Sequence, residues 1–396
     1  MMKMVNEHTQ RFIDAIDGGL AVLTAYDQVQ LSGDMAAPFL QEGNFWWLTQ
    51  VTQPGWKVII DGARRNVVLV RPEIDEIHRI FDGEASDERL LAQSGAHEII
   101  LHKDFEKYLA RLSNVHSVVR TYVDKTDYGF AHNPAQRELY AVLSRIFTSV
   151  QDCGVQLASL RALKDANEIA VMKQAAKLTC AAFADVRDRL SQYAHEYEIE
   201  ADFTQYFRRH NATHAYEPIV ASGANAVTLH YIENNDRLSK NKLVLIDIGA
   251  RVNGYCADIT RTYCINPTKR QRAVHGAVEA AHHRIIELIQ PNLTVAEYMH
   301  AVDEIMKDAL CELRLLEARS DETTYRRYFP HSVSHGLGVD VHDSLGRPRY
   351  LQPGMVLTVE PGIYIAEEGI GVRIEDDILV TETGHLNLTA ALSTSL

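Results

Sequence analysis

The spacing of apolar residues changes character about 155 residues into the chain. Before that point, short apolar runs alternate with helical patterns. Asn66–Val70 and Glu98–Leu101 are rich in Val, Leu and Ile and predict strands. Phe105–Leu112 predicts an amphipathic helix, and Asn133–Val150 predicts a longer helix that begins at an Asn-Pro pair. This mixture predicts an α/β domain with a sheet of its own.

A domain boundary is expected between Gln151 and Leu163, where Asp152-Cys153-Gly154 interrupts the preceding helix. A new helical period begins at Ala166. We therefore predict one domain over residues 1–155 and a second over residues 156–396.

Two strand pairs are predicted in the second region. Leu243–Ile248 and Tyr255–Ile265 form the first pair, around an Asn253-Gly254 turn, because Asn-Gly is a strong hairpin signal. Met355–Ile365 and Gly371–Thr381 form the second pair, joined by a short acidic turn that contains glycine.

Two helices are predicted between these strand pairs. The first covers Thr268–Ile289 and is ended by Pro291. The second begins at a Thr294–Glu297 capping box and reaches about Leu316. A strand pair, two helices and another strand pair make an α+β arrangement.

Composition narrows the class of protein. The chain is 46% hydrophobic and 23% charged, which is ordinary for a soluble globular protein. Its 40 Lys and Arg against 53 Asp and Glu leave a net charge of −13, which argues against nucleic acid as the main partner. Five cysteines without a CxxC pair favour reduced, structural thiols over a disulfide scaffold. No signal peptide or apolar run of about 20 residues is visible, so we expect a cytoplasmic protein without a membrane partner.

Four carboxylates occupy positions in the predicted strands where an apolar residue is expected. Asp247 and Asp258 lie eleven positions apart around the Asn-Gly turn, so they can face each other across the hairpin. Glu360 and Glu375 interrupt the two strands of the second pair. Taken singly, each acid would more often be a solvent-facing strand residue. Buried carboxylates are costly unless they are paired, hydrogen-bonded or bound to metal, so four of them together call for cations.

A glycine-containing segment, residues 331–343, adds three histidines within thirteen residues: His331, His335 and His342. Glycine permits a close approach of the backbone to a site. Two Asp, two Glu and one His offer mainly oxygen ligands, which suit Mn²⁺ or a similar divalent ion better than a thiolate-rich zinc site would. Bridging carboxylates can hold two such ions about 3.5–4 Å apart.

These motifs resemble the proline-specific metallopeptidases of the pita-bread fold, the group of the Xaa-Pro dipeptidases (prolidases) and aminopeptidase P. The resemblance covers the chain from about Arg161 to its end. It implies a catalytic pita-bread domain over residues 156–396, preceded by a creatinase-like N-terminal α/β domain over residues 1–155. It also implies a homodimer and two divalent metal ions, with Mn²⁺ favoured and Co²⁺ or Zn²⁺ as alternatives.

The resemblance assigns the metal ligands. Asp247 and Asp258 would chelate one ion, with Asp258 bridging to the second. His335 and Glu360 would complete the shell of the second ion, and Glu375 would bridge both. A hydroxide held between the ions would attack the scissile carbonyl, with Glu360 as the proton shuttle.

Two other histidines match non-ligand histidines of the family. His342 and His230 would stabilise the tetrahedral intermediate and position the substrate. Arg373 lies two residues before Glu375, on the same strand face, and matches an arginine that steadies the acids or the substrate.

Each remaining candidate for a substrate contact could instead have a purely structural role. Tyr231 lies on a loop, residues 217–236, that we expect to be mobile, and it could close over substrate or simply pack. His331 could touch substrate or form hydrogen bonds within its own segment. Arg347 or Arg349 could bind the terminal carboxylate of a substrate, against the alternative of a solvated rim. The cluster Trp46, Trp47 and Trp56 is more typical of a core than of a site.

We therefore predict a dimetal peptidase that hydrolyses the Xaa-Pro bond of dipeptides, because Arg347 or Arg349 offers a carboxylate clamp. The alternative is an aminopeptidase P that releases the N-terminal residue from longer Xaa-Pro peptides. A metal-free creatinase-like hydrolase and a non-catalytic peptide-binding module are disfavoured, because all five ligand positions are filled. Methionine aminopeptidases are shorter and usually lack a domain like residues 1–155.

Overall fold

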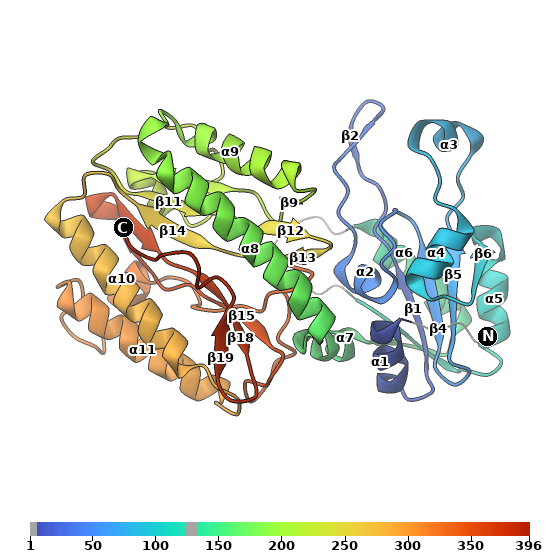
Figure 1. The fold of residues 1–396 in the computed structure, drawn as a ribbon. Helices are drawn as coiled ribbons and strands as arrows, with labels where there is room; N and C mark the ends of the chain where they lie inside the picture. Colours follow the sequence, from blue (N-terminus) through green and yellow to red (C-terminus); the bar gives the residue numbers. More distant parts are fainter. Residues whose placement is uncertain (1–5, 124–132) are drawn as a thin grey trace. The chain divides into compact units, whose positions relative to one another are not determined.

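The computed structural model describes residues 6–123 and 133–396. The chain divides into two compact units, Met1–Leu160 and Arg161–Leu396 (Figure 1). The division falls inside helix α7 (Gly154–Ala162).

The first unit is built on a six-stranded mixed sheet with the strand order β6-β5-β4-β1-β7-β8. Strand β4 runs antiparallel to its neighbours β1 and β5, whereas the pairs β5–β6, β1–β7 and β7–β8 are parallel. The strands are β1 (Leu20–Thr24), β4 (Lys57–Asp61), β5 (Asn66–Arg71), β6 (Glu98–Leu101), β7 (Val118–Thr121) and β8 (Ser149–Asp152).

Helices α5 and α6 pack on this sheet. Leu109 of α5 and Leu143 of α6 share one apolar core with Val22 and Val68 of the strands. A separate two-stranded hairpin, β2 (Gln30–Ser32) and β3 (Met35–Ala36), lies outside the sheet. The helices described in this unit are α1 (Glu7–Ala15), α2 (Gly43–Thr49), α3 (Glu76–Asp82), α4 (Asp87–Ser94), η1 (His102–Asp104), α5 (Phe105–Leu112) and α6 (Pro134–Ile146).

The strands predicted at Asn66–Val70 and Glu98–Leu101 and the helix predicted at Phe105–Leu112 are confirmed. The helix predicted over residues 133–150 is too long, because α6 ends at Ile146 and the chain becomes extended at Phe147. Val150 then pairs with Val119 in the parallel β7–β8 ladder. The helix therefore ends where the chain begins to pair with a neighbouring strand, and this pairing cannot be seen in the local sequence.

The second unit has two halves, each combining sheets with two long helices. In the first half, the sheets β10-β11-β14 and β13-β12-β9 pack on α8 and α9. Phe183 and Phe203 of the helices share a core with Val220 and Ile246 of the strands. The elements are α8 (Ala166–Asp188), η2 (Leu190–Gln192), α9 (Glu196–Arg209), β9 (Thr213–His214), β10 (Ile219–Ser222), η3 (Gly223–Val227), β11 (Val244–Asp247), β12 (Ala250–Val252), β13 (Tyr255–Cys256) and β14 (Thr260–Tyr263).

In the second half, the sheets β15-β18-β19 and β16-β17 pack on α10 and α11. Val278 and Val302 of the helices share a core with Leu357, Ile363 and Ile378. The elements are α10 (Lys269–Leu288), α11 (Val295–Glu312), α12 (Glu322–Tyr328), β15 (Val356–Val359), β16 (Gly362–Ile365), η4 (Ala366–Glu368), β17 (Ile370–Arg373), β18 (Asp376–Val380) and β19 (His385–Asn387).

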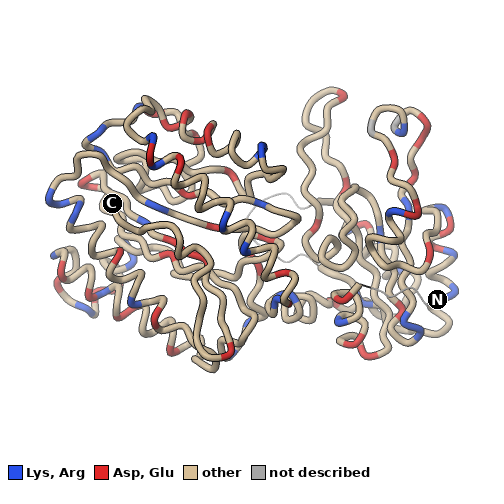
Figure 2. The backbone as a smooth tube through the Cα atoms, viewed as in Figure 1, with Lys and Arg blue, Asp and Glu red and all other residues tan. Residues whose placement is uncertain are grey.

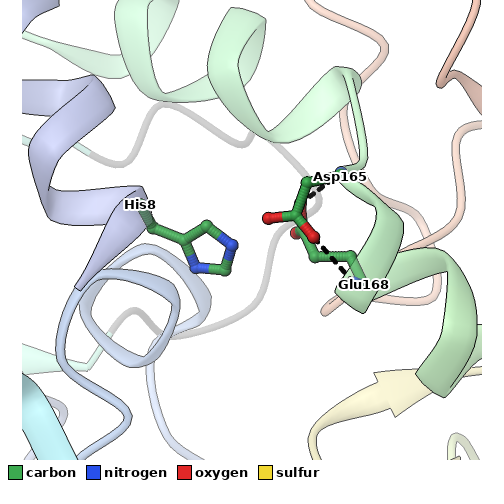
Figure 3. A group of neighbouring side chains, drawn as sticks. All are labelled: His8, Asp165 and Glu168. Carbon is green, nitrogen blue, oxygen red and sulfur yellow. Dashed lines mark hydrogen bonds between the residues drawn. The ribbon is translucent and has the colours of Figure 1, made fainter.

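Long helices of this unit begin at capping boxes. The Asp165 carboxylate accepts a hydrogen bond from the Glu168 N–H, and the Glu168 carboxylate accepts one from the Asp165 N–H (Figure 3). The Asp165 carboxylate also accepts one from the Asn167 N–H. The predicted Thr294 box is present, and Thr268 forms a third one. Helix α11 ends at Glu312, before the predicted Leu316, because Arg314 adopts a φ of 58° that a right-handed helix cannot contain.

The two predicted strand pairs are confirmed, but each is interrupted beside an acid. Strands β11 and β14 pair antiparallel, and the Asn253-Gly254 turn joins β12 to β13. In the second pair, the ladder breaks at Glu360-Pro361 and again around Ile374-Glu375, because proline has no N–H to continue it. The freed N–H of Glu375 donates to the Thr260 carbonyl at 3.0 Å, which links the two halves.

Acidic and basic residues are interspersed along both units (Figure 2). All five cysteines are free thiols, and Trp47 and Trp56 are buried in the first unit. Within residues 6–123 and 133–396, no helix is long and apolar enough to cross a membrane.

Candidate metal centre

The first pair of acids comes from the β11–β14 hairpin. Asp247 is the last residue of β11, and its cross-strand partner is Thr260, not Asp258 as predicted. Asp258 instead lies in the gap between β13 and β14. The two carboxylates nevertheless converge, because the Tyr216 hydroxyl lies 2.6 Å from Asp247 Oδ1 and 2.5 Å from Asp258 Oδ1.

The second pair of acids comes from the other half of the unit. Glu375 is brought beside the first hairpin by its backbone link to Thr260. The Thr260 hydroxyl then donates to Glu375 Oε2 at 2.6 Å. Glu360 directly follows β15 and accepts a hydrogen bond from the Thr358 hydroxyl at 3.2 Å.

His335 lies between the two acid pairs. Its Nε2 is 3.5 Å from Asp258 Oδ2 and 3.4 Å from Glu360 Oε1. The segment that carries it must pass close to its own backbone at Gly336, where a Cβ would approach the Asp343 carbonyl oxygen to 2.4 Å. Glycine is therefore required there for the segment to fold back on itself.

Burial and mutual repulsion shift the protonation equilibria of this cluster. Burial is the largest cause of the raised pKa of Asp258 and of Glu375, and the neighbouring carboxylates add to both. Burial also raises the pKa of Glu360 to about 7. For His335 burial acts in the lowering direction, but Asp258 and Glu360 outweigh it and raise the pKa to about 9. The cluster thus favours a positive charge at its centre.

The donor set fits divalent ions. Ligand atoms of Asp258, His335 and Glu375 all lie within 4.8 Å of one another. Carboxylate oxygens with one imidazole suit a hard or borderline divalent ion, and crowded acids lose their repulsion when such ions bind. The structure thus brings together the ligands proposed from the sequence, whose roles stay a prediction: Asp247, Asp258, His335, Glu360 and Glu375.

A chain of hydrogen bonds leads out of the acid cluster through Arg373. Its guanidinium is buried, pairs with Asp247 and donates to the Tyr364 hydroxyl at 2.9 Å. The Tyr364 hydroxyl lies 2.9 Å from His331 Nε2. Burial lowers the pKa of His331 to about 4, so this ring is neutral near pH 7. Arg373 is therefore paired with one of the acids, and both of its predicted roles stay predictions.

Two further predicted histidines, His342 and His230, are exposed. The His342 ring is 4.2 Å from the His335 ring, centroid to centroid. Burial, followed by the charges of His335 and His230, lowers the pKa of His342 to about 4. The charge of His230 also contributes to the lowered pKa of His331. The charge of His230 thus reaches both His331 and His342, and the substrate roles proposed for His342 and His230 stay predictions.

The other predicted substrate contacts are less closely tied to the cluster. Tyr231 is buried, and its hydroxyl donates to Glu196 at 2.9 Å, so it packs in this structure. Arg347 is exposed and adopts a φ of 51°. Arg349 is exposed and lies over the ring of Tyr350. The substrate-binding roles of Tyr231 and Arg347 stay predictions.

Comparison with known proteins gives the family. A model of metallopeptidase family M24 matches residues 170–382, and a model of the aminopeptidase P N-terminal domain matches residues 5–120. The chain belongs to metallopeptidase family M24. The pita-bread α+β fold expected from the sequence is confirmed, together with the aminopeptidase P type of N-terminal domain.

Similar M24 proteins are named as Xaa-Pro aminopeptidases. The chain is 33% identical to the Xaa-Pro aminopeptidase of Escherichia coli (strain K12), over 95% of this chain and 91% of that one. It is 34% identical to that of Haemophilus influenzae, over 91% and 87%. Among solved structures, E. coli aminopeptidase P matches with a TM-score of 0.87 at 30% identity, over 98% of this chain and 96% of that one. Proline aminopeptidase P II from Yersinia pestis matches with a TM-score of 0.86 at 32% identity, over 98% and 97%.

Four residues that lie in or next to the acid cluster were missed from the sequence. Thr260 and Asp377 lie two positions after Asp258 and Glu375, so period-two spacing was an available signal. Asp377 is buried and accepts hydrogen bonds from the Asp258 N–H at 3.3 Å. Tyr216 and Tyr364 carried no local signal, because Tyr216 contacts Asp247 and Asp258, and Tyr364 contacts His331 and Arg373, only through the tertiary fold.

Proposed function

We propose that this protein is an aminopeptidase P, which releases the N-terminal residue from peptides with proline in the second position. The observation that carries the proposal is the convergence of four carboxylates and His335 in one site. The similarity to Xaa-Pro aminopeptidases over more than 90% of the chain supports the specificity. These relatives favour the longer-peptide reaction over the dipeptidase reaction that we first expected from the sequence.

Asp247, Asp258, His335, Glu360 and Glu375 would hold two divalent ions, for which we propose Mn²⁺. When bound, such ions supply an activated water and polarise the scissile carbonyl. The protein's own contribution is to hold these acids close together against their repulsion, which Arg373 does for Asp247 through a buried ion pair.

Glu360 is proposed as the proton shuttle. Its side chain is 15% exposed, against 11% for Asp247 and 6% for Asp258. It therefore has the freest access to bound water and to a leaving nitrogen. The distance of 3.4 Å to His335 Nε2 holds its carboxylate at the inner edge of the site.

His342 and His230 are proposed to donate hydrogen bonds to the substrate. Both residues are exposed, and the low pKa of His342, about 4, keeps that ring neutral near pH 7. A neutral imidazole can donate one N–H to a carbonyl oxygen whose negative charge grows during the reaction. His331 is held by its contacts to Ser332 and Tyr364, which favours an orienting role.

Selectivity for proline follows from the missing N–H of the Xaa-Pro bond. Peptidases that bind an extended backbone lose a hydrogen bond at this position. A site that instead binds the free amine and the carbonyl at a metal centre avoids this loss. A homodimer and a cytoplasmic location remain part of the proposal, as the family resemblance and the composition suggest.

The test compares Ala-Pro-Ala with Ala-Pro, using protein stripped of metal and then reloaded with Mn²⁺. Ala-Ala-Ala serves as the control for proline selectivity, and Asp258→Asn as the control for the site. We expect release of alanine from Ala-Pro-Ala, little from Ala-Ala-Ala, and loss of both metal uptake and turnover in the variant.

Cleavage of Ala-Pro alone would favour the dipeptidase, for which Arg347 and Arg349 are candidate carboxylate ligands. That outcome is checked further with Arg347→Ala, which should then raise KM for the dipeptide. Binding of two metals without cleavage of either peptide would refute both reactions and favour a peptide-binding module.

A further inference from the structure

Glu196 is a buried carboxylate with no part in the chemistry described so far. It is the first residue of α9, and its exposed fraction is 0%. Its Oε1 accepts hydrogen bonds from the Ser222 N–H at 2.7 Å and the Asn225 amide at 3.2 Å. Its Oε2 accepts from the Tyr231 hydroxyl and the Asp236 N–H, both at 2.9 Å.

These four donors are spread along one loop, residues 222–236, which follows β10. Ser222 and Asp236 stand at its two ends, and Asn225 and Tyr231 lie within it. The Glu196 N–H also donates to the Asp236 carbonyl at 3.0 Å. A single carboxylate therefore holds the loop at its beginning, in its middle and at its end. This loop lies within the segment of residues 217–236 that the sequence suggested to be mobile.

A second buried residue reinforces the end of the loop. Asn234 is 1% exposed and accepts a hydrogen bond from the Val220 N–H at 2.8 Å. Its amide donates to the Pro218 carbonyl and to the Glu200 carboxylate, both at 2.9 Å. Contacts with α9 and β10 thus hold this end of the loop in place.

These contacts restrict the position of His230, the residue before Tyr231 in the loop. It directly precedes Tyr231, whose side chain is buried on Glu196, while His230 itself is exposed. Because the two side chains are neighbours along the backbone, fixing Tyr231 restricts where the His230 imidazole can stand. Tyr231 also shares an apolar cluster with Tyr364, whose hydroxyl contacts both Arg373 and His331, so this part of the loop lies next to the metal centre.

The Glu196 carboxylate is suited to this task because it can only accept hydrogen bonds. In the described part of the chain it meets donors and no salt-bridge partner. A glutamine in its place would turn one acceptor oxygen into an NH₂ group that faces two donors, so at least one pair of contacts must be lost.

We propose that Glu196 is a positioning residue for His230, which holds the loop of residues 222–236 so that the imidazole stands at the metal centre. The inference rests on the proposed function, in which His230 binds the reacting carbonyl. It assigns Tyr231 as an anchor of the loop and not as a lid over substrate.

The test combines Glu196→Gln with His230→Ala in a double-mutant cycle on Ala-Pro-Ala. The matched control is Glu198→Gln, the same change two residues along α9, where the carboxylate accepts from the Ala194 N–H and not from the loop. We expect Glu196→Gln to lower kcat about 10- to 100-fold, because a misplacement of about 1 Å costs about that much. Metal content and KM should change little, since none of the proposed ligands contacts Glu196.

The cycle separates positioning from a general loss of structure. If Glu196 acts through His230, the double variant is no slower than His230→Ala alone. An additive loss, an unchanged kcat or a loss of metal in Glu196→Gln would each overturn the proposal. If Glu196→Gln does not fold, Tyr231→Phe can take its place, because it removes one hydrogen-bond donor and leaves the Glu196 carboxylate intact. It should lower kcat about 2- to 5-fold, and again only when His230 is present.

Hydrogen exchange separates this inference from the proposed function. Peptides covering residues 222–236 should exchange faster in Glu196→Gln than in Glu198→Gln. If the unmodified protein cleaves no Xaa-Pro peptide, the proposed function fails, and the exchange measurement still decides whether Glu196 holds the loop. Equal exchange in the two variants would overturn the inference even in an active enzyme.

Discussion

The buried guanidinium of Arg261 offers a sharp test of what holds the two halves of the second unit together. Its side chain is fully buried and pairs with Asp376 Oδ1 at 2.6 Å. It also donates to the Thr260, Glu375, Leu392 and Ser393 carbonyls. Arg261→Met keeps a long apolar side chain but removes the charge and all of these donors.

The expected loss in the free energy of unfolding follows from the environment of Asp376, which is 2% exposed. After the substitution this carboxylate keeps the Thr389 hydroxyl and the Asn387 amide, both at 2.7 Å, but loses its cation. Breaking one side of a buried ion pair costs about 3–5 kcal/mol, because the remaining carboxylate stays buried with no cation, next to a His282 ring 3.4 Å away that is neutral near pH 7. With an m-value of about 2–3 kcal/mol/M, the urea midpoint should fall by about 1–2 M.

The assay is urea unfolding of metal-free protein, followed by circular dichroism, so that metal binding does not contribute. Arg284→Met is the matched control, because Arg284 and Asp308 form a 3.2 Å ion pair whose side chains are 52% and 39% exposed. Such an exposed pair should contribute less than about 1 kcal/mol. The double variant Arg261→Met/Asp376→Asn should lose less than the sum of its single variants, because it leaves no buried charge unpaired. The reasoning would be refuted if Arg261→Met lowered the free energy of unfolding by no more than Arg284→Met does.

Three further predictions concern the site and the pH dependence of folding stability. His335→Ala and Asp258→Asn should each remove metal uptake, measured by elemental analysis, and turnover of Ala-Pro-Ala; activity in metal-stripped protein would contradict the proposed role of both residues. His342→Ala should lower kcat about 100-fold at near-normal metal content, as expected for a lost hydrogen-bond donor, whereas loss of metal would make it a ligand. Burial lowers the pKa of His282 to about 4, so the unfolded chain binds the extra proton first and stability should fall as the pH drops from about 6.5 to 4, by up to about 3 kcal/mol. His282→Gln should flatten that part of the stability curve, and an unchanged slope would show that His282 is not its cause.

Local signals in the sequence determined much of the second unit. The Thr294 capping box and the Asn253-Gly254 turn act over a few residues, and both form as predicted. The five proposed ligands were also identifiable, because an acid in an apolar strand is conspicuous and the histidine segment is glycine-rich. A buried charge needs a partner, so its presence in a strand already implies a site.

Tertiary structure decided which of these residues meet and what holds them there. The link between Thr260 and Glu375 spans more than a hundred positions and sets the two hairpins side by side. Tyr216, Arg261 and Glu196 have no periodic or motif signal, because each acts on residues distant in the chain. Capping and turn chemistry depend on neighbours within a few residues, whereas these contacts exist only after the sheets and helices have packed. The sequence alone could therefore indicate the donors of the metal centre, and only the fold shows how they are held.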